Sequence, residues 1–422
     1  MPTEPTGTLE GLLRRRWCGT TKPGMRLALI LSAGRDDLGG IETSADGLGR
    51  ALAARGHEIV LVAGTLAPRW RQLPPAVASV QVPALPARAA ITRGLARLLR
   101  MPPLNVRSLS FFTRFLASPA ARRLLAGCDA ALTFLEGDAV LFSRHLARAG
   151  RATVYYYPGA IDRRWVRRDR STRRVATSHL VAERSARLLG YPAHGVVWPG
   201  VSGELLRQPC RAEAQGEANR LVFSGRLEAE AKRPDRLLPL LGALSGEFPG
   251  LALRLVGEGS QRSRLQDEAA RAGLAERVSF AGPQPPSGVR AELAEADIAV
   301  VPSTFESFGV AALEALAAGV PVVASDLPGL REATGGHARL VAPDDLAAWV
   351  AATRRLLLSP DERREASRAG RAFASGMTWE RAAQEMEPFL FEAVRELGRS
   401  ALAEPPQARR NEREHHGGPG DP

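Results

Sequence analysis

Lysine is nearly absent from this sequence: Lys22 and Lys232 are the only two among 57 basic residues, and the others are arginines. In so arginine-rich a chain, a lysine in a loop indicates a need for a compact ammonium in place of a planar guanidinium. Cysteine is also scarce, with Cys18, Cys128 and Cys210 widely spaced. An odd number at such spacing argues against a disulfide framework and a cysteine metal site, so we expect reduced thiols and no structural metal.

Long apolar runs are missing as well. The sequence has no stretch of about 18 apolar residues that could cross a bilayer. Its first 24 residues carry an arginine triplet after a short apolar stretch and lack the long apolar core of a signal peptide. We therefore expect a cytoplasmic protein. With 422 residues, 45% hydrophobic and 24% charged, the chain can form two cores of about 200 residues each.

Acidic residues are absent between Glu58 and Asp129, a stretch that carries ten arginines among leucine, isoleucine and phenylalanine. Residues 1–215 hold 32 basic and 15 acidic residues, whereas residues 216–422 hold 25 and 30. Such a stretch suits an anionic membrane surface, where each basic side chain contributes about 1 kcal/mol. Nucleic acid fits less well, because no aromatic platform, zinc-ligand spacing or helix-turn-helix pattern accompanies the arginines. The alternative is that the arginines only solvate helix faces.

Strand and helix patterns alternate in both halves, which predicts two doubly wound parallel sheets. The first βαβ unit has a strand at 26–32, a glycine turn, a helix at about 43–55 and a strand at 58–63. Gly39 and Gly40 lie in that turn, at the strand end where open parallel sheets bind ligands. Further strands are predicted at 129–134, 153–157, 174–178, 196–199, 221–225, 251–256, 278–281, 298–302, 320–324 and 339–341.

The junction at residues 301–329, VPSTFESFGVAALEALAAGVPVVASDLPG, carries two glutamates eight positions apart. Glu306 lies in the turn after an apolar strand, and Glu314 lies inside the alanine-rich helix pattern that follows. Free N–H groups at a helix start attract anions, so this loop can hold a diphosphate while a carboxylate orients hydroxyls. The alternative is that both glutamates are ordinary surface residues.

A second loop, GRLEAEAKR at residues 225–233, contains Arg226 and Lys232. It follows the first predicted strand of the second half. Both cations suit a diphosphate, and Lys232 is one of only two lysines in the chain.

These strings resemble the motifs of the retaining family 4 glycosyltransferases, the glycosyl transferases group 1. The 301–329 segment resembles their E-x7-E motif, and the 225–233 loop resembles their G-R-x5-K diphosphate clamp. GGIETSADGLGRALAARGHEIVLV at 39–62 is similar to their first loop, and VGEGSQRSRL at 256–265 is similar to the segment near the base and ribose. The resemblance covers roughly residues 25–398 and is thin between about 65 and 125.

The resemblance implies an α/β chain of the GT-B fold, with two Rossmann-like doubly wound parallel-sheet domains facing a cleft. The first would bind an acceptor and the second a nucleotide sugar, most simply a UDP- or GDP-sugar. It implies a catalytic set of Glu306 at the sugar hydroxyls and Arg226 and Lys232 at the diphosphate. The other implied donor-binding residues are Gly39, Gly40, Gly257, Phe308, Gly309 and, at the ribose, Glu314.

The implied boundaries are an N-terminal extension at 1–24, the acceptor domain at 25–205 and the nucleotide-sugar domain at 206–378. A helix at 379–402 would return to the first domain, and the polar tail at 403–422 would be disordered.

Many of these enzymes carry a histidine facing the sugar, but here ALTFLEGDAV and VYYYPGAID stand at the corresponding places. Tyr156 and Glu136 are therefore the acceptor-side candidates. Retaining transfer can proceed without a histidine, because the departing diphosphate oxygen can accept the incoming hydroxyl's proton.

The implied activity is metal-independent hexosyl transfer, with no cofactor, from a nucleotide sugar to an acceptor hydroxyl. Glycolipid, cell-envelope polysaccharide or glycoconjugate synthesis, with a lipid-linked acceptor at the inner face of the membrane, would suit the basic segment. Two alternatives stay open: a nucleotide-sugar 2-epimerase, and a non-catalytic sugar-nucleotide-binding partner.

Overall fold

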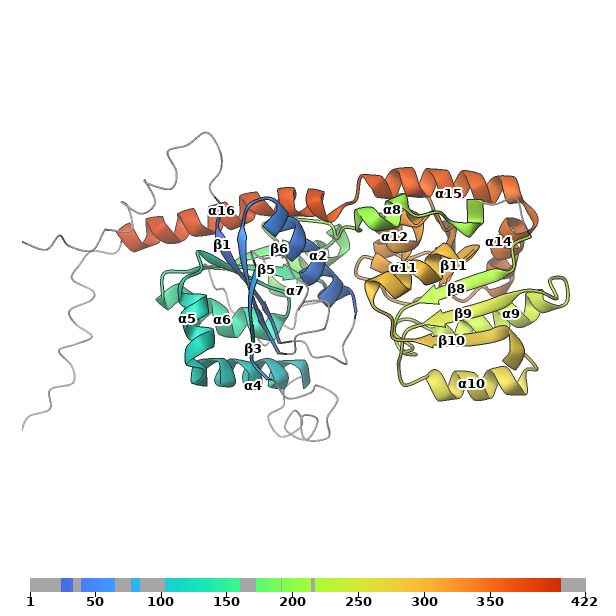
Figure 1. Cartoon of the computed structure of the whole chain (residues 1–422), viewed down its shortest axis with the longest axis horizontal. Coiled ribbons are helices and arrows are strands. Elements are labelled where there is room, and N and C mark those ends of the chain that lie inside the picture. The colour runs from blue at the N-terminus through green and yellow to red at the C-terminus, as the bar shows by residue number, and fades with distance from the viewer. Residues whose placement is uncertain are drawn as a thin grey trace, which may run out of the picture.

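The computed structural model describes residues 24–32, 39–64, 77–83, 103–159, 172–190, 192–213 and 217–403. They form two domains, each a parallel sheet between layers of helices (Figure 1). Several features of the sequence lie outside the described residues: Cys18, Lys22, the arginines from 69 to 100 and the tail from 404.

The first domain holds a seven-stranded sheet with the order β3-β2-β1-β4-β5-β6-β7. Its strands are β1 Arg26–Leu31, β2 Glu58–Ala63, β3 Val77–Gln81, β4 Ala130–Thr133, β5 Ala152–Tyr157, β6 Thr172–Ala176 and β7 Gly195–Val196. Its helices are α2 Gly40–Ala54, α4 Pro103–Ala117, α5 Pro119–Ala126, α6 Glu136–Arg148 and α7 His179–Leu189. The strand order reverses between β1 and β4, the place where sheets of this kind bind ligands.

The side chains of β1 alternate between the two faces of the sheet, and each face packs against different helices. Leu27, Leu29 and Leu31 pack with residues of α2 and of the last helix, whereas Ala28 and Ile30 pack with α4, α5 and α6. Successive side chains of a strand point to opposite faces, so a strand covered on both sides must be apolar throughout.

The second domain holds a six-stranded sheet with the order β10-β9-β8-β11-β12-β13, and its strand order reverses between β8 and β11. Its strands are β8 Arg220–Ser224, β9 Ala252–Val256, β10 Val278–Gly282, β11 Ile298–Val301, β12 Val322–Ser325 and β13 Arg339–Val341. Its helices are α8 Gly203–Arg207, α9 Leu237–Ser245, α10 Arg262–Arg271, α11 Pro286–Ala294, α12 Val310–Ala317, α13 Pro328–Thr334, α14 Leu346–Leu358 and α15 Pro360–Ser375.

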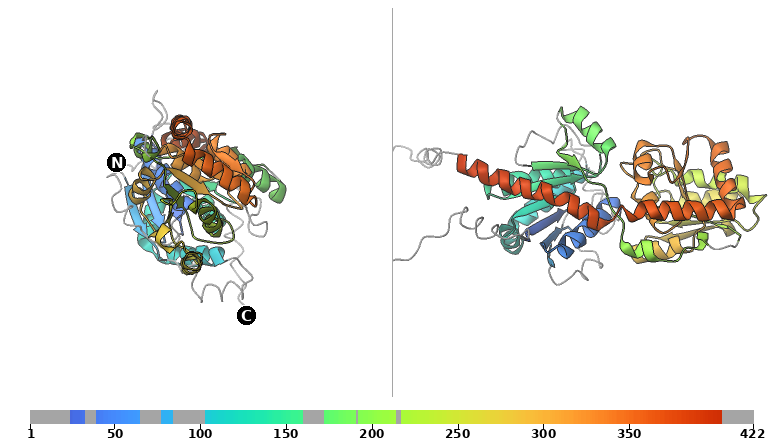
Figure 2. Two further views of the ribbon diagram at one scale, coloured as in Figure 1. Left: turned by 90° about the vertical axis from the view of Figure 1, so that its right-hand side faces the viewer. Right: turned by 90° about the horizontal axis from the view of Figure 1, so that it is seen from above.

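The last helix, α16 Trp379–Ala403, leaves the second domain and runs along the first (Figure 2). It packs against α2 and β5, and Trp379, Met386 and Leu390 belong to the same core as β1. The chain crosses between the domains at two adjacent points, because Val201 and Thr378 form a parallel bridge. Val201 also donates its N–H to the Met377 carbonyl at 2.9 Å.

Beyond small shifts at strand ends, the structure differs from the predicted elements in three main places. Strand β3 was not predicted, and α2 begins at Gly40 instead of Thr43. The segment 206–219, predicted as a polar link, contains the end of α8 and a short 3₁₀ helix, Arg211–Glu213, both packed on α15. No helix within the described ranges is both long enough and apolar enough to cross a bilayer.

Candidate functional site

The loop between β11 and α12 holds Glu306 in a defined position. Its carboxylate is only 8% exposed, and Oε1 accepts hydrogen bonds from Lys232 Nζ at 2.7 Å and Ser303 Oγ at 2.8 Å. The structure thus brings together two residues predicted from separate motifs. Ser303 was not predicted, although it lies in the same loop as Glu306.

The loop that carries Lys232 is fastened to the Glu306 loop by its backbone. Thr304 donates its N–H to the Ala231 carbonyl at 2.8 Å and its hydroxyl to the Glu230 carbonyl at 2.9 Å. Arg226 begins the same loop at the end of β8, where its side chain is exposed. Within the described part of the chain its side chain has no ion-pair or hydrogen-bond partner, so its guanidinium is available to an anion.

Helix α12 starts directly beside Glu306. Its N-cap is Gly309, whose φ of +116° a residue with a side chain rarely adopts. A Cβ at this position would lie 2.7 Å from Leu330 Cδ2. Because the first N–H groups of a helix have no carbonyl partner within it, this end can bind an anion. The Phe308 side chain is 3% exposed and packs in the core, which leaves only its backbone for a ligand.

Glu314 lies further along α12, half-buried. Burial raises the pKa of its carboxyl to about 7. Among the described residues its side chain has no cationic or hydrogen-bonding partner. A half-buried carboxyl without a partner can accept hydrogen bonds from the hydroxyl groups of a ligand that approaches it.

The N-terminus of α2 meets the N-terminus of α12 across the domain boundary. A Cβ on Gly40 would lie 4.0 Å from Val310 Cγ2. Gly39 is the N-cap of α2, and its N–H donates to Glu42 Oε2 at 3.0 Å. Two helix starts from different domains therefore lie next to one another, as a ligand bound between the domains would require.

Gly257 follows β9 and donates its N–H to the Gly282 carbonyl at 2.9 Å. Any Cβ there would overlap the Gly225 carbonyl oxygen, at 1.9 Å. The close approach joins the turn after β9 to the turn that carries Arg226.

The acceptor-side candidates lie in different surroundings. Tyr156 is 1% exposed in the core between β5 and α16, and its hydroxyl donates to the Val197 carbonyl at 2.9 Å. The structure therefore places Tyr156 in the packed core. Its position in an apolar strand of the sequence could not by itself distinguish core packing from a ligand contact. Glu136 is half-buried at the first residue of α6, next to the carboxyl end of β4.

Contacts between the domains surround Glu306, and sequence reasoning missed them. Ser178, the N-cap of α7, donates its hydroxyl to the Ser307 carbonyl at 2.6 Å. Glu332 of α13 accepts from the His179 backbone N–H at 2.8 Å, contacts His179 Nδ1 at 2.8 Å, and accepts from Trp198 Nε1 at 2.5 Å. These partners lie far apart in sequence, and no local motif marks them.

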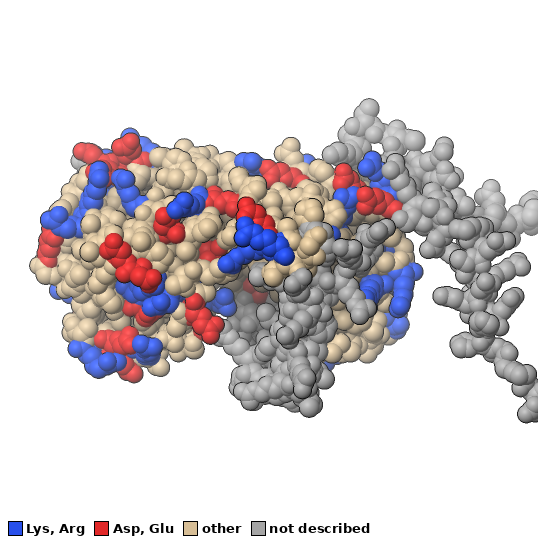
Figure 3. Space-filling model, turned by 180° about the vertical axis from the view of Figure 1, so that it is seen from behind, with Lys and Arg blue, Asp and Glu red and all other residues tan. Residues whose placement is uncertain are grey.

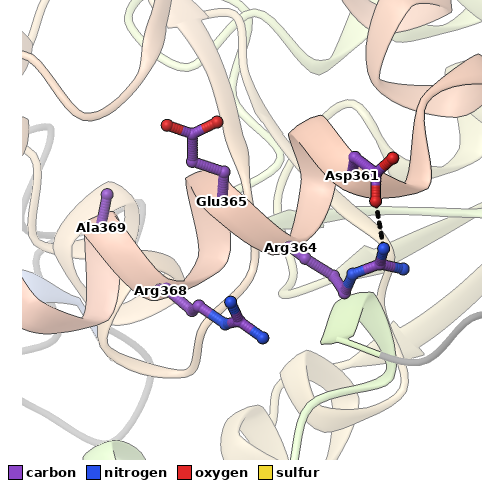
Figure 4. Close-up of a pocket in the computed structure, with 5 residues that line it drawn as sticks. All are labelled: Asp361, Arg364, Glu365, Arg368 and Ala369. Carbon is purple, nitrogen blue, oxygen red and sulfur yellow. Dashed lines mark hydrogen bonds and ion pairs between the residues drawn. The ribbon is translucent and has the colours of Figure 1, made fainter.

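A surface depression of about 560 Å³ lies elsewhere, on α15 (Figure 4). Asp361, Arg364, Glu365, Arg368 and Ala369 line it, and Asp361 pairs with Arg364. These residues share one helix face and include none of the predicted site residues. No cluster of histidine, cysteine, aspartate and glutamate that could hold a metal ion occurs within the described ranges.

Comparison with known proteins identifies the domain that holds Glu306 and Lys232. Residues 209–373 match the family model of the glycosyl transferases group 1. This part of the chain is a group 1 glycosyltransferase domain. A D-inositol 3-phosphate glycosyltransferase of Nocardia farcinica is 36% identical over 204 residues, which is 45% of this chain and 45% of that protein. The chain spans about half the length of the curated relatives it matches.

Solved structures share the arrangement of both domains. Sucrose-phosphate synthase from Thermosynechococcus elongatus superimposes with a TM-score of 0.67 at 19% identity, covering 87% of this chain and 98% of that one. Anabaena Alr3699/HepE in complex with UDP and glucose gives 0.68 at 17% identity, covering 87% and 100%. The predicted GT-B fold is thereby confirmed.

Proposed function

We propose that this protein transfers a sugar, with retention of configuration, from a nucleotide-diphosphate sugar to an acceptor hydroxyl. The observation that carries the proposal is the Lys232–Glu306 ion pair at the start of α12, inside a group 1 glycosyltransferase domain. A bound diphosphate would attract the Lys232 ammonium, and Glu306 would then be available to sugar hydroxyls. The neighbour solved with UDP and glucose supports a donor of this chemical class.

In this proposal the protein's own cations do the work that a divalent metal does elsewhere. Arg226 and Lys232 stabilise the charge that develops on the diphosphate as the bond from the anomeric carbon to the phosphate oxygen breaks. The acceptor oxygen forms the new bond on the same face, and its proton passes to the departing phosphate oxygen. Glu314 accepts hydrogen bonds from the ribose hydroxyls, and the α2 turn at Gly39 and Gly40 approaches the donor from the first domain.

The test is a panel of UDP-, GDP- and ADP-sugars observed by NMR over hours, with EDTA present and absent. We expect one donor to bind and to be hydrolysed slowly, with the released sugar first appearing in the donor's anomeric configuration. Glu306→Gln and Lys232→Ala should each lower turnover about 100-fold or more. Glu230→Gln, an exposed carboxylate on the same loop as Lys232, is the matched control and should keep full turnover.

The same panel separates the alternatives. A nucleotide-sugar 2-epimerase would invert the configuration at C2 of the donor without any acceptor. A non-catalytic partner would bind a donor and leave it intact for as long as the spectra are recorded. Turnover that survives in Glu306→Gln and Lys232→Ala would overturn the proposal.

We also propose that the first domain docks on an anionic membrane through α4 and α5, which would bring it close to a lipid-linked acceptor. Arg114, Arg122 and Arg123 are exposed there beside Leu116, itself 38% exposed. Burial lowers the pKa of His145, and the charges of Arg122 and Arg148 lower it further. Over the second domain, by contrast, basic and acidic side chains are interspersed (Figure 3).

Sedimentation with liposomes tests this docking. We expect binding to vesicles that contain anionic lipid, weaker binding to neutral vesicles, and loss of the difference in Arg122→Ser/Arg123→Ser. Arg271→Ser/Arg368→Ser removes two exposed arginines from the second domain and is the control. Equal binding to both kinds of vesicle would contradict an electrostatic contribution.

A further inference from the structure

The residue after Lys232 has an unusual backbone conformation. Arg233 has φ +47° and ψ +51°, and it is the one non-glycine residue with positive φ in the part of the chain that the structure describes. L-residues with a Cβ disfavour this left-handed region. Pro234 follows, and a residue before proline is pushed toward an extended conformation. Two local preferences therefore oppose the conformation that Arg233 adopts.

An ion pair within the turn holds Arg233 in place. Its Nε donates to Asp235 Oδ1 at 2.9 Å, and its terminal nitrogen donates to Oδ2 at 2.8 Å. Burial alone would raise the pKa of Asp235, but the hydrogen bonds and charge of Arg233 lower it. Strained backbone of this kind persists only where surrounding contacts fix it, and it concentrates at functional sites.

The turn determines where Lys232 points, because it is fixed on both sides. Arg233 donates its N–H to the Glu228 carbonyl at 3.2 Å, and Thr304 holds the Ala231 carbonyl from the Glu306 loop. Arg236, one residue beyond Asp235, donates to the Pro302 carbonyl at 3.3 Å. A relaxed backbone at Arg233 would rotate the peptide next to Lys232 and move its ammonium away from Glu306.

We propose that Arg233 is a positioning residue, whose ion pair with Asp235 holds the left-handed turn that directs Lys232 to Glu306 and to the donor diphosphate. The part that concerns the donor rests on the function proposed above. The part that concerns Glu306 does not, and the two can be measured separately.

The scarcity of lysine provides a direct probe of Lys232. In protein labelled with ¹³C at lysine Cε, the Lys22→Arg background leaves a single lysine signal, that of Lys232. The chemical shift of this signal in Glu306→Gln is the reference for an ammonium without its ion pair. We compare Arg233→Ala, which lacks the ion pair and keeps the strain, with Arg233→Gly, which lacks the ion pair and adopts positive φ freely. Asp235→Asn and Arg233→Gly/Asp235→Asn complete the set, and circular dichroism verifies folding of each variant.

We expect the Lys232 signal of Arg233→Ala and Asp235→Asn to move toward the unpaired position. The signal of Arg233→Gly should stay near the wild-type position. The double variant Arg233→Gly/Asp235→Asn should give the same signal as Arg233→Gly, because without the Arg233 guanidinium the Asp235 carboxylate has no ion pair to form in this turn. Equal displacement in Arg233→Gly and Arg233→Ala would overturn the proposal, since the guanidinium and not the backbone would then matter. An unmoved signal in Asp235→Asn would overturn it too.

Calorimetric titration with UDP, GDP and ADP forms the second arm. For the nucleotide that binds the wild type, we expect about tenfold weaker binding to Arg233→Ala and a change within about threefold for Arg233→Gly. If none of the three binds the wild type while the NMR pattern holds, the proposed function fails and the positioning of Lys232 toward Glu306 stands. Weaker binding to Arg233→Gly than to Arg233→Ala would overturn the proposal.

Discussion

At the scale of single residues, the hydrogen-bond and ion-pair partners of a covered polar group decide whether it can meet a ligand. Glu306 and Tyr156 are buried and Glu314 is half-buried, but their partners differ. Glu306 has Lys232 and Ser303, and Tyr156 has the Val197 carbonyl. Glu314 has neither a cation nor a hydrogen-bond donor among the described residues, so its ionisation costs stability that the fold does not recover.

Glu314→Gln should therefore stabilise the protein in a pH-dependent way. Burial raises the folded-state pKa of Glu314 to about 7, so the folded state holds a proton that the unfolded state releases near pH 4.5. Stability is lost as pH rises from about 4.5 through about 7. Because Glu314 is only half-buried, we expect a gain of about 1 to 2 kcal/mol for Glu314→Gln at pH 8 and little at pH 5. Melting temperatures of the wild type and of Glu314→Gln, measured from pH 5 to pH 8, check this prediction. An equal difference in melting temperature at pH 5 and at pH 8 would contradict it.

Tyr156→Phe separates packing from catalysis. The change removes the hydroxyl that donates to the Val197 carbonyl, and it should cost about 1 kcal/mol of unfolding free energy. Donor turnover and acceptor transfer should stay unchanged, because the hydroxyl already has its partner inside the first domain. Denaturant unfolding and the turnover assay on the same preparation measure both. Normal stability with lost transfer would instead support the prediction that Tyr156 contacts the acceptor.

The residues that sequence could predict are those carried by contiguous motifs. Glu306 and Lys232 each lie in a recognisable string, and parallel-sheet geometry places both strings at the carboxyl ends of neighbouring strands. Glu332 shows the opposite case, because His179 and Trp198 lie 153 and 134 residues away from it. The burial of Tyr156 depends on α16, which is distant in sequence, so its local pattern could not reveal that it packs in the core.

At the scale of secondary structure, apolar runs predict the central strands better than the edges. Strand β3, VASVQ, lies at one edge of its sheet, and its residues 78–81 are half-buried or exposed. So short a strand with polar residues carries a weak periodic signal. The start of α2 at Gly40 was missed for another reason: the Glu42 carboxylate binds the Gly39 N–H and begins the helix before its first strongly helical residues.

Gly309→Ala tests whether the start of α12 needs its left-handed N-cap. The backbone strain costs roughly 1 to 2 kcal/mol, and the added Cβ also meets Leu330 at 2.7 Å. We expect a lower melting temperature and weaker donor binding, because the helix start would shift. Gly273→Ala is the control: Gly273 has φ +71° with nothing within 4 Å of a Cβ, and it follows α10, away from Glu306. Equal losses of melting temperature and of donor affinity in both variants would show that backbone strain alone, wherever it occurs, causes the effects.

At the scale of the whole molecule, a few polar contacts fix how the two domains face one another. Glu332 joins α13 to the start of α7 and to Trp198, beside the Ser178 contact to Ser307. Arg184 covers the Phe305 ring at 4.9 Å from the same direction. All of these contacts surround the loop that carries Glu306, so the relative position of the domains and the geometry of the site are set together.

Glu332→Ala should loosen the domains without changing either one. It leaves the His179 and Trp198 N–H groups to water, which should allow a wider separation in solution. We expect a larger radius of gyration by small-angle X-ray scattering and lower transfer, with nucleotide affinity within about threefold of wild type. Glu365→Ala, an exposed glutamate on α15, is the control. Unchanged scattering together with normal transfer would show that the remaining contacts suffice.

The return of α16 to the first sheet has a consequence for the order of events during synthesis. Trp379, Met386 and Leu390 belong to the core beneath β1 and α2, yet they are translated after the whole second domain. Domains emerging from a ribosome generally fold from the N-terminus onward. Here the domain that starts first is completed last, and until α16 is made, the part of this apolar sheet face that α2 does not cover has no partner within the described part of the chain.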